Sequence, residues 1–314
     1  MTYQAAEHPA IGWIGAGRMG LQMASRLLAA GHQLAVYNRT AAKAGPLLSR
    51  GAVSAGAPAE LAGRDVVFTV VAGSDDLLAV TTGENGLLTD PRRAPSLLVD
   101  FSTVSMQASA EVRKAAENRG TEFLAAPVSG NPKVVRAGKL SLAVSGRSET
   151  FAAAEPLLAL FGARVTYVGV DETARLVKIC HNVLLGVIMQ SLVEITVLAE
   201  KGGTSRAAFL EFINHSVVGS MFSQYKSPAI VHLDFTPTFT VPLLLKDFDL
   251  GLAAARELGA PMPVASAAAA LVASALGAGY RTEDFAILLL EQARRAGITL
   301  TAEDTEVDDG LEVS

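Results

Sequence analysis

The feature that most limits how this chain can fold is a glycine-rich turn between an apolar run and a helical repeat. The run spans residues 11–14, the turn spans residues 15–20, and apolar residues then recur at helical spacing until Gly31. In a strand–turn–helix unit, the glycines of such a turn allow a sharp bend, close approach of a phosphate to the backbone, and tight packing of helix on sheet. The helix N-terminus then holds the anion. We therefore predict that a dinucleotide pyrophosphate contacts Gly15, Gly17, Arg18, Met19 and Gly20.

The type of dinucleotide is selected at the end of the second apolar run, residues 34–37. About twenty residues after the turn, where the adenosine ribose should lie, the chain has Asn38, Arg39 and Thr40. An acidic residue here typically binds the ribose of NAD, whereas the 2′-phosphate of NADP is repelled by a carboxylate and favours a guanidinium. Because Arg39 is present and a carboxylate is missing, the sequence favours NADP(H) over NAD(H). The alternative is that these residues only cap the next helix.

Further apolar runs predict a doubly wound α/β domain in the first half of the chain. They span residues 66–71, 97–100, 122–125, 140–145 and 165–168. Runs that are apolar on both faces are typical of a parallel sheet covered by helices. We therefore expect a Rossmann-type, doubly wound parallel sheet in a dinucleotide-binding domain, residues 1–170.

The second half is predicted to be all-helical. Residues 173–201 are apolar on nearly every face, as a long helix buried between two bodies would be, and further helices are expected at about 205–216, 241–258, 263–276 and 282–296. This pattern predicts an interdomain helix leading into a helical substrate and oligomerisation domain, residues 171–300, and a disordered acidic tail, residues 301–314. Apolar faces on the helical domain favour a homodimer or homotetramer formed through it.

Composition narrows the classes of partner. The 314 residues are half hydrophobic, which is enough for two cores, and the net charge of −5 with scattered basic residues does not favour nucleic acid. Residues 1–8 lack signal-peptide features, and the uncharged run 179–193 falls short of a membrane span. We therefore expect a cytoplasmic protein with no nucleic-acid or membrane partner. The single cysteine, Cys180, is expected to be a small core residue, and the five histidines show no metal-ligand spacing, so we predict no metal.

Lys178 is the most conspicuous candidate for proton transfer. It stands in an apolar helical run, with Asn182 one turn later on the same face. Its stem could pack on the helix while the ammonium reaches water. Alternatively, desolvation could lower its pKa from the usual value of about 10.4 and make it a general acid. Periodicity does not decide between these alternatives.

Three other polar segments are candidates for ligand contacts. The turn of residues 127–131 could offer N–H and O–H donors to a carboxylate, or form an ordinary loop. Residues 102–103 follow a strand and could contact a dinucleotide at the carboxyl end of the sheet, or cap the next helix. Lys246 and Asp247 either pair in solvent or face a ligand between the domains, and their spacing favours solvent.

Together these segments resemble the β-hydroxyacid dehydrogenase family, which includes 3-hydroxyisobutyrate dehydrogenase and the glyoxylate or succinic semialdehyde reductases. The family's signature pieces occur in order between residues 11 and 297: the glycine turn, residues 100–103, residues 127–130, Lys178 with Asn182, and Lys246 with Asp247. The resemblance implies reversible hydride transfer between a nicotinamide and the carbonyl carbon of a small carboxylate-bearing aldehyde. The product of reduction would be a β-hydroxy acid or a related hydroxy acid.

The resemblance also implies a role for each matching residue. Lys178 corresponds to the catalytic lysine, which protonates the substrate oxygen during reduction and recovers that proton during oxidation. Asn182 corresponds to its neighbour that holds substrate or lysine, and Ser129 and Gly130 correspond to the loop that binds the substrate carboxylate. Contacts with the dinucleotide are implied for Val71, Ala72, Thr103, Lys246 and its supporting partner Asp247.

The chain departs from the family pattern after Ser129 and Gly130, where a second glycine and then a Gly-Ala pair usually follow. It has Asn131 there, which we keep among the substrate-binding candidates, and then residues 133–136, whose larger side chains either reshape the pocket or face solvent. Two alternative functions stay open. An imine reductase of similar architecture typically has a different residue in place of Lys178, and a non-catalytic dinucleotide-sensing protein would lack this proton donor.

Overall fold

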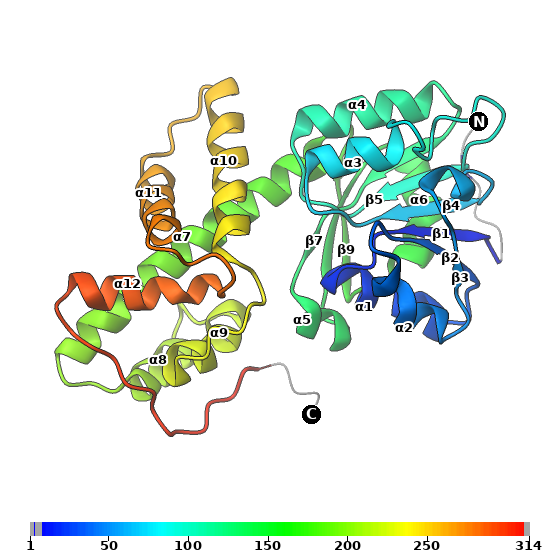
Figure 1. Cartoon of the computed structure of the whole chain (residues 1–314). Helices are drawn as coiled ribbons and strands as arrows, with labels where there is room; N and C mark the ends of the chain where they lie inside the picture. Colours follow the sequence, from blue (N-terminus) through cyan, green and yellow to red (C-terminus); the bar gives the residue numbers. More distant parts are fainter. Residues whose placement is uncertain (1–2, 4–7, 311–314) are drawn as a thin grey trace. The chain divides into compact units, whose positions relative to one another are not determined.

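The structure, a computed structural model, describes residue 3 and residues 8–310 of the chain (Figure 1). It divides into two compact units, residues 1–178 and 179–314. The boundary between these units lies inside the long helix α7 (Thr173–Lys201), near the domain boundary expected at residue 170. The first turns of α7 belong to the sheet unit because Ala174 N donates to Ser145 Oγ (3.1 Å) and Arg175 bonds to Asp100.

The first unit is built on a single sheet, whose described strands number nine. They are β1 (Ile11–Ile14), β2 (Leu34–Tyr37), β3 (Val53–Ser54), β4 (Val66–Thr69), β5 (Leu97–Asp100), β6 (Glu122–Ala125), β7 (Val128–Ser129), β8 (Ser141–Ser145) and β9 (Arg164–Gly169). Their order is β3-β2-β1-β4-β5-β6-β8-β7, with β9 paired to β8. The prediction of a doubly wound parallel sheet is confirmed for β1 to β6. The sheet turns antiparallel where β8 meets β6 and the two-residue β7.

Helices lie on both faces of this sheet, as Figure 1 shows. They are α1 (Arg18–Ala29), α2 (Gly45–Leu48), α3 (Ser74–Thr81), α4 (Met106–Glu117), α5 (Pro132–Arg136) and α6 (Ser148–Leu158), with short 3₁₀ turns η1 (Ala41–Ala44) and η2 (Pro58–Leu61). Successive strand residues point to opposite faces, so Trp13 packs in the core under α1 and α6 while Ile14 packs in the core under α3 and α4. Both faces of the strands are therefore apolar, as the sequence pattern predicts.

Among the described residues of the second unit, all the named secondary-structure elements are helices. After α7 come α8 (Arg206–His215), α9 (Met221–His232), α10 (Val241–Glu257), α11 (Pro263–Gly277), the 3₁₀ turn η3 (Phe285–Ile287) and α12 (Leu288–Arg295). Helix α9 was not predicted from the sequence, because three of its five buried residues are polar: Ser223, Lys226 and Ser227. A buried polar face gives no apolar periodicity to detect.

Lys226 is stabilised by a carboxylate that lies far along the chain. Its Nζ donates to Asp284 Oδ1 (2.5 Å) and Thr238 Oγ1 (3.1 Å), and it lies 4.3 Å from the centroid of the Phe285 ring. Burial alone would raise the pKa of Asp284. The Lys226 charge and the hydrogen bonds from Lys226, Ala286 and Thr238 outweigh burial and hold this pKa below its usual value. This polar cluster joins α9, the segment before α10, and η3.

One side of α7 is apolar and exposed, although the helix also contributes to the core. Its exposed residues recur at helical spacing and comprise Val177, Cys180, Leu184, Ile188, Ile195 and Leu198. The prediction that Cys180 is a core residue is therefore wrong, because a helix that is apolar on all faces does not reveal which face is buried. Within the described residues α7 alone is long and apolar enough for a membrane span, and an 18-residue stretch of it has a mean hydropathy of 1.8. Half of that stretch is buried inside the protein, and core helices of soluble proteins can have the same length and hydropathy.

The segment after residue 300 is not disordered where the structure describes it. The Glu303 carboxylate accepts hydrogen bonds from Arg206 N (2.8 Å) and Ala207 N (3.0 Å), which begin α8, and Glu303 N donates to Val231 O (3.0 Å). His232 Nε2 lies 2.8 Å from Thr305 O. The expectation of a disordered acidic tail is wrong for residues 301–310, since the unpaired N–H groups of a helix start require an acceptor. Residues 311–314 lie outside the described part.

Candidate active site

The glycine turn has the geometry that a bound pyrophosphate requires. Gly15 has φ +103°, and a Cβ there would overlap the carbonyl oxygen of Val70; a Cβ on Gly20 would overlap the carbonyl oxygen of Gly15. Packing of the backbone therefore requires the first and third glycines. A Cβ on Gly17, in contrast, would meet no described atom within 4 Å. Gly17 occupies the N-cap of α1 without a side chain to cap it, so the first turn of α1 is open to an anion.

The side chains after β2 have different local partners. Asn38 Oδ1 accepts from Ala16 N (2.7 Å) and its Nδ2 donates to Thr40 O (2.8 Å), so this amide ties the end of β2 to the glycine turn. Thr40 stands at the N-cap of η1 but makes no capping bond with its side chain. The Arg39 side chain is 83% exposed and forms an ion pair with Asp76 of α3, with 2.7 Å between Nη1 and Oδ1.

A buried network supports the loops after β4 and β5. Asp100 Oδ1 accepts from Thr69 Oγ1 (2.5 Å) and Ser102 Oγ (2.7 Å), while Ser102 Oγ accepts from Val71 N (2.9 Å). These bonds join the backbone of Val71, and thus the turn to Ala72, to the Ser102–Thr103 loop. Ser102 therefore supports the loop with its side chain and does not cap the following helix, whose N-cap is Ser105.

Arg175 extends this network into α7. Its Nη2 donates to Asp100 Oδ2 (2.5 Å), its Nη1 to Ser102 O (2.7 Å) and its Nε to Ser109 Oγ (3.0 Å). Burial lowers the pKa of this guanidinium, and the Asp100 carboxylate opposes that effect. Arg175 was not among the residues predicted from the sequence, although it has the same feature as Lys178: a charged residue within an apolar helix start.

The turn around Gly130 has both structural and ligand-binding features. Gly130 has φ +139°, and a Cβ there would come within 2.8 Å of Leu140 and Val134. Asn131 Oδ1 caps α5 by accepting from the N–H groups of residues 133 and 134, whereas its buried Nδ2 has no hydrogen-bond partner among the described residues. Val134 and Val135 are buried in the core, and Lys133 and Arg136 are exposed. The Nδ2 group of Asn131 can thus donate a hydrogen bond to a ligand, two residues after Ser129 of β7.

In the second unit the structure brings Asn182, Lys246 and Asp247 together. Asn182 Nδ2 donates to Asp247 Oδ2 (2.5 Å), and Lys246 Nζ lies 3.2 Å from Asp247 Oδ1. Asp247 is 1% exposed, so the expectation that this pair is solvated is wrong for the aspartate. It faces the asparagine of α7 because α10 packs beside that helix. Lys178 is partly buried, one turn before Asn182.

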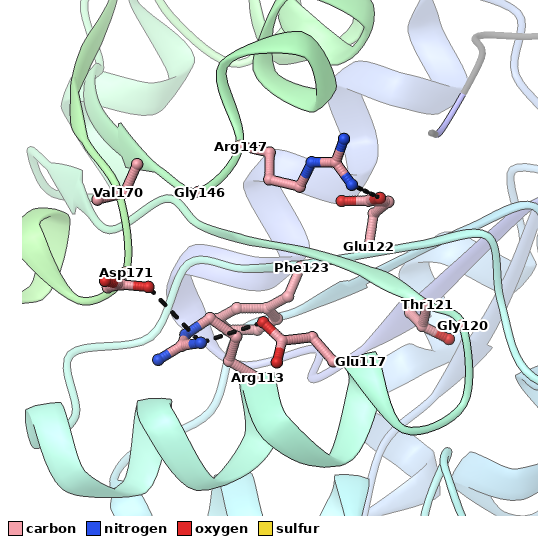
Figure 2. Close-up of a pocket in the computed structure, with 10 residues that line it drawn as sticks. All are labelled: Arg113, Glu117, Gly120, Thr121, Glu122, Phe123, Gly146, Arg147, Val170 and Asp171. Carbon is pink, nitrogen blue, oxygen red and sulfur yellow. Dashed lines mark hydrogen bonds and ion pairs between the residues drawn. The ribbon is translucent and has the colours of Figure 1, made fainter. Parts of the chain in front are cut away.

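A separate pocket in the sheet unit lies at the amino end of β6, where Figure 2 shows its charged lining. The predicted dinucleotide contacts, in contrast, follow the carboxyl ends of the parallel strands. Arg113 pairs with Glu117 (3.0 Å) and Asp171 (3.6 Å), and Arg147 pairs with Glu122 (3.2 Å). The hydrogen bond from Arg113 to Glu172 raises the arginine pKa against the effect of burial. Each lining arginine is thus neutralised, and the pocket is not suited to an anion.

Similarity to known proteins agrees with this geometry. A family model described as the NAD binding domain of 6-phosphogluconate dehydrogenase matches residues 10–169, and a model described as NAD-binding of NADP-dependent 3-hydroxyisobutyrate dehydrogenase matches residues 173–290. The 3-hydroxyisobutyrate dehydrogenase of Pseudomonas aeruginosa is 32% identical over 266 residues, covering 82% of this chain and 89% of that protein. The chain belongs to the β-hydroxyacid dehydrogenase family. This β-hydroxyacid dehydrogenase is thus an NAD(P)-dependent oxidoreductase that acts on a CH–OH group.

Other relatives of this β-hydroxyacid dehydrogenase include reductases. Glyoxylate/succinic semialdehyde reductase 2 of Arabidopsis thaliana is 29% identical over 280 residues, covering 89% of this chain and 78% of that protein. The solved structure of 3-hydroxyisobutyrate dehydrogenase from Salmonella typhimurium has a TM-score of 0.81 at 26% identity and covers 90% of this chain and 99% of that one. A reductive aminase from Aspergillus terreus, with a TM-score of 0.60 and 24% identity over 90% of this chain and 99% of that one, shares the fold.

Proposed function

We propose that this enzyme interconverts a small carboxylate-bearing aldehyde and its β-hydroxy acid, or a related hydroxy acid, with NADP(H) preferred over NAD(H) and Lys178 as the general acid and base. The observation that supports this most directly is the bonding of Arg175 to Asp100 and Ser102 at the carboxyl end of β5. Ligands of open α/β sheets bind at such strand ends. Lys178 follows Arg175 by one helical turn, which supports a role beside the dinucleotide.

The residues present fit a dinucleotide. The open first turn of α1 behind Gly17 suits the pyrophosphate, Arg39 suits the 2′-phosphate, and the loops at residues 71–72 and 102–103 follow neighbouring strand ends. When bound, the dinucleotide supplies or accepts the hydride. The family resemblance assigns a further dinucleotide contact to Lys246, which pairs with Asp247 within the helical unit.

The chain's own residues handle the substrate and the proton. The Lys178 ammonium donates a proton to the substrate oxygen as charge develops on it, and takes the proton back in the reverse direction. Asp247 holds the amide of Asn182 through a buried hydrogen bond, so that Asn182 is oriented one turn from Lys178. Backbone and hydroxyl donors at Ser129 and Gly130 bind the carboxylate, together with Asn131 Nδ2, which has no partner in the described part of the chain.

The test is a panel of substrates combined with one variant. NADPH oxidation is measured with glyoxylate, succinic semialdehyde, methylmalonate semialdehyde and a cyclic imine, and repeated with NADH. Lys178→Ala should lower kcat by about 10²–10⁴-fold, the usual contribution of a general acid, and leave NADPH binding within about twofold. Lys201→Ala, on the same helix, is the matched control and should retain activity.

Each alternative has its own outcome. Normal turnover by Lys178→Ala refutes the proposed role of the lysine. Activity confined to the imine favours an imine reductase, and tight NADPH binding without turnover of any substrate favours a dinucleotide sensor. A preference for NADH refutes the role of Arg39.

We also propose that the enzyme is a homodimer or homotetramer formed through the helical unit. The support is the exposed apolar side of α7, where Leu184, Ile188, Ile195 and Leu198 are 40–70% exposed. Contiguous exposed apolar residues mark association surfaces in many proteins. A second copy would bury this side against its own.

A further inference from the structure

Arg39, the residue we propose to hold the 2′-phosphate, shares its guanidinium with a carboxylate from another element. Asp76, in the first turn of α3, has Oδ1 2.7 Å from Arg39 Nη1. The Arg39 side chain is 83% exposed and that of Asp76 is 31% exposed, so the pair lies at the surface. The acidic group that is missing after β2 is therefore present beside Arg39, supplied by α3.

We propose that Asp76 is a specificity-determining residue of the dinucleotide site, which weakens binding of the 2′-phosphate and offers an acceptor to the 2′-hydroxyl of NAD(H). A phosphate bound to Arg39 must share or displace the aspartate on the same guanidinium. The two anions then lie close together and repel each other. A ribose hydroxyl, in contrast, donates a hydrogen bond to a carboxylate. This inference rests on the proposed role of Arg39.

The neighbouring Asn38 does not take over this selection. Both polar atoms of the Asn38 amide are bonded to the backbone, through Oδ1 to Ala16 N and through Nδ2 to Thr40 O, and the group carries no charge. The Arg39 guanidinium and the Asp76 carboxylate are thus two opposite charges at the end of β2 that can act on a ribose 2′ substituent. Their balance sets the preference between the two dinucleotides.

The size of the effect follows from the exposure of the pair. Interactions between exposed charges are screened by water and salt, and an exposed ion pair contributes little to stability. Asp76→Asn should therefore fold normally and change dinucleotide affinity by about threefold to tenfold. Asp75, the preceding residue in the same helical turn, carries the same charge and provides a matched control.

The experiment measures equilibrium binding and does not depend on catalysis. NADPH and NADH are titrated into the full-length protein, and dissociation constants are read from the fluorescence of the reduced nicotinamide. Asp76→Asn should bind NADPH about threefold to tenfold more tightly than wild type and NADH no more tightly. Asp75→Asn should change the ratio of the two constants by less than about twofold, and added salt should reduce the effect of Asp76→Asn.

The outcomes separate this inference from the proposed function. If the wild type binds neither dinucleotide, both are refuted. If the wild type binds NADPH but Asp76→Asn leaves the ratio of constants unchanged, only the role of Asp76 is refuted. Weaker NADPH binding by Asp76→Asn would also overturn it, because the aspartate would then orient Arg39 for the phosphate.

Discussion

Replacement of Arg175 by methionine tests whether the buried network at the carboxyl end of β5 holds the start of α7. Arg175 is 1% exposed and Asp100 is 0% exposed. The Arg175→Met variant keeps an unbranched, apolar stem but loses the guanidinium and its bonds to Asp100, Ser102 and Ser109. Asp100 Oδ1 keeps its partners Thr69 and Ser102, whereas Oδ2 becomes a buried charge without its counter-ion.

The expected loss of stability is large. Removing one partner of a buried ion pair typically costs about 3–5 kcal/mol, and domains have a total stability of about 5–15 kcal/mol. Asp100→Asn added to Arg175→Met removes the stranded charge, and the double variant should regain about 1 kcal/mol or more over Arg175→Met alone. Activity should fall by up to about 100-fold, because Lys178 lies one turn after Arg175 and catalysis is sensitive to small displacements.

The chain has a suitable internal probe for this measurement. Trp13 is the only tryptophan, and it is fully buried in the sheet unit. Urea unfolding followed by its fluorescence therefore reports on the unit that contains Arg175 and Asp100. An unchanged unfolding midpoint in Arg175→Met, or a double variant no more stable than the single one, would refute the reasoning.

Two further predictions concern the helical unit. Because the folded pKa of Asp284 is depressed, its interaction with Lys226 stabilises the fold above the unfolded pKa of about 3.9, and this contribution is lost as pH falls through the folded value. Asp284→Asn should thus be about 3 kcal/mol less stable than wild type at pH 7, and this difference should shrink below pH ~4. Thermal unfolding followed by circular dichroism measures the difference. A difference that stays constant from pH 7 to 3 would contradict the prediction. Ile188→Glu with Ile195→Glu should dissociate the proposed oligomer in sedimentation velocity, whereas Glu194→Gln should not; a monomeric wild type would disprove the interface.

Local patterns determined much of this fold and part of the candidate site. The glycine turn was predicted from the residue types and their spacing. Its local part is the packing of Gly20 against the carbonyl oxygen of Gly15, whereas Gly15 itself packs against Val70, which lies far along the chain. Strands β1, β2, β5 and β6 begin and end at the predicted residues, since apolar runs of four between turn residues have few alternatives. The long α7 has its predicted bounds for the same reason.

Contacts between distant segments determined the rest. Lys226 is buried in α9 because it pairs with Asp284, and this partner lies 58 positions away along the chain. Asp76 likewise pairs with Arg39 across 37 positions. The exposed side of α7, the burial of Asp247 and the order of residues 301–310 likewise depend on which element packs alongside. The sequence alone therefore determined that a dinucleotide turn, a sheet and a helical half exist. Only the tertiary structure decided which charges are paired and which faces are covered, because an ion pair or a buried face depends on neighbours that spacing along the chain does not reveal.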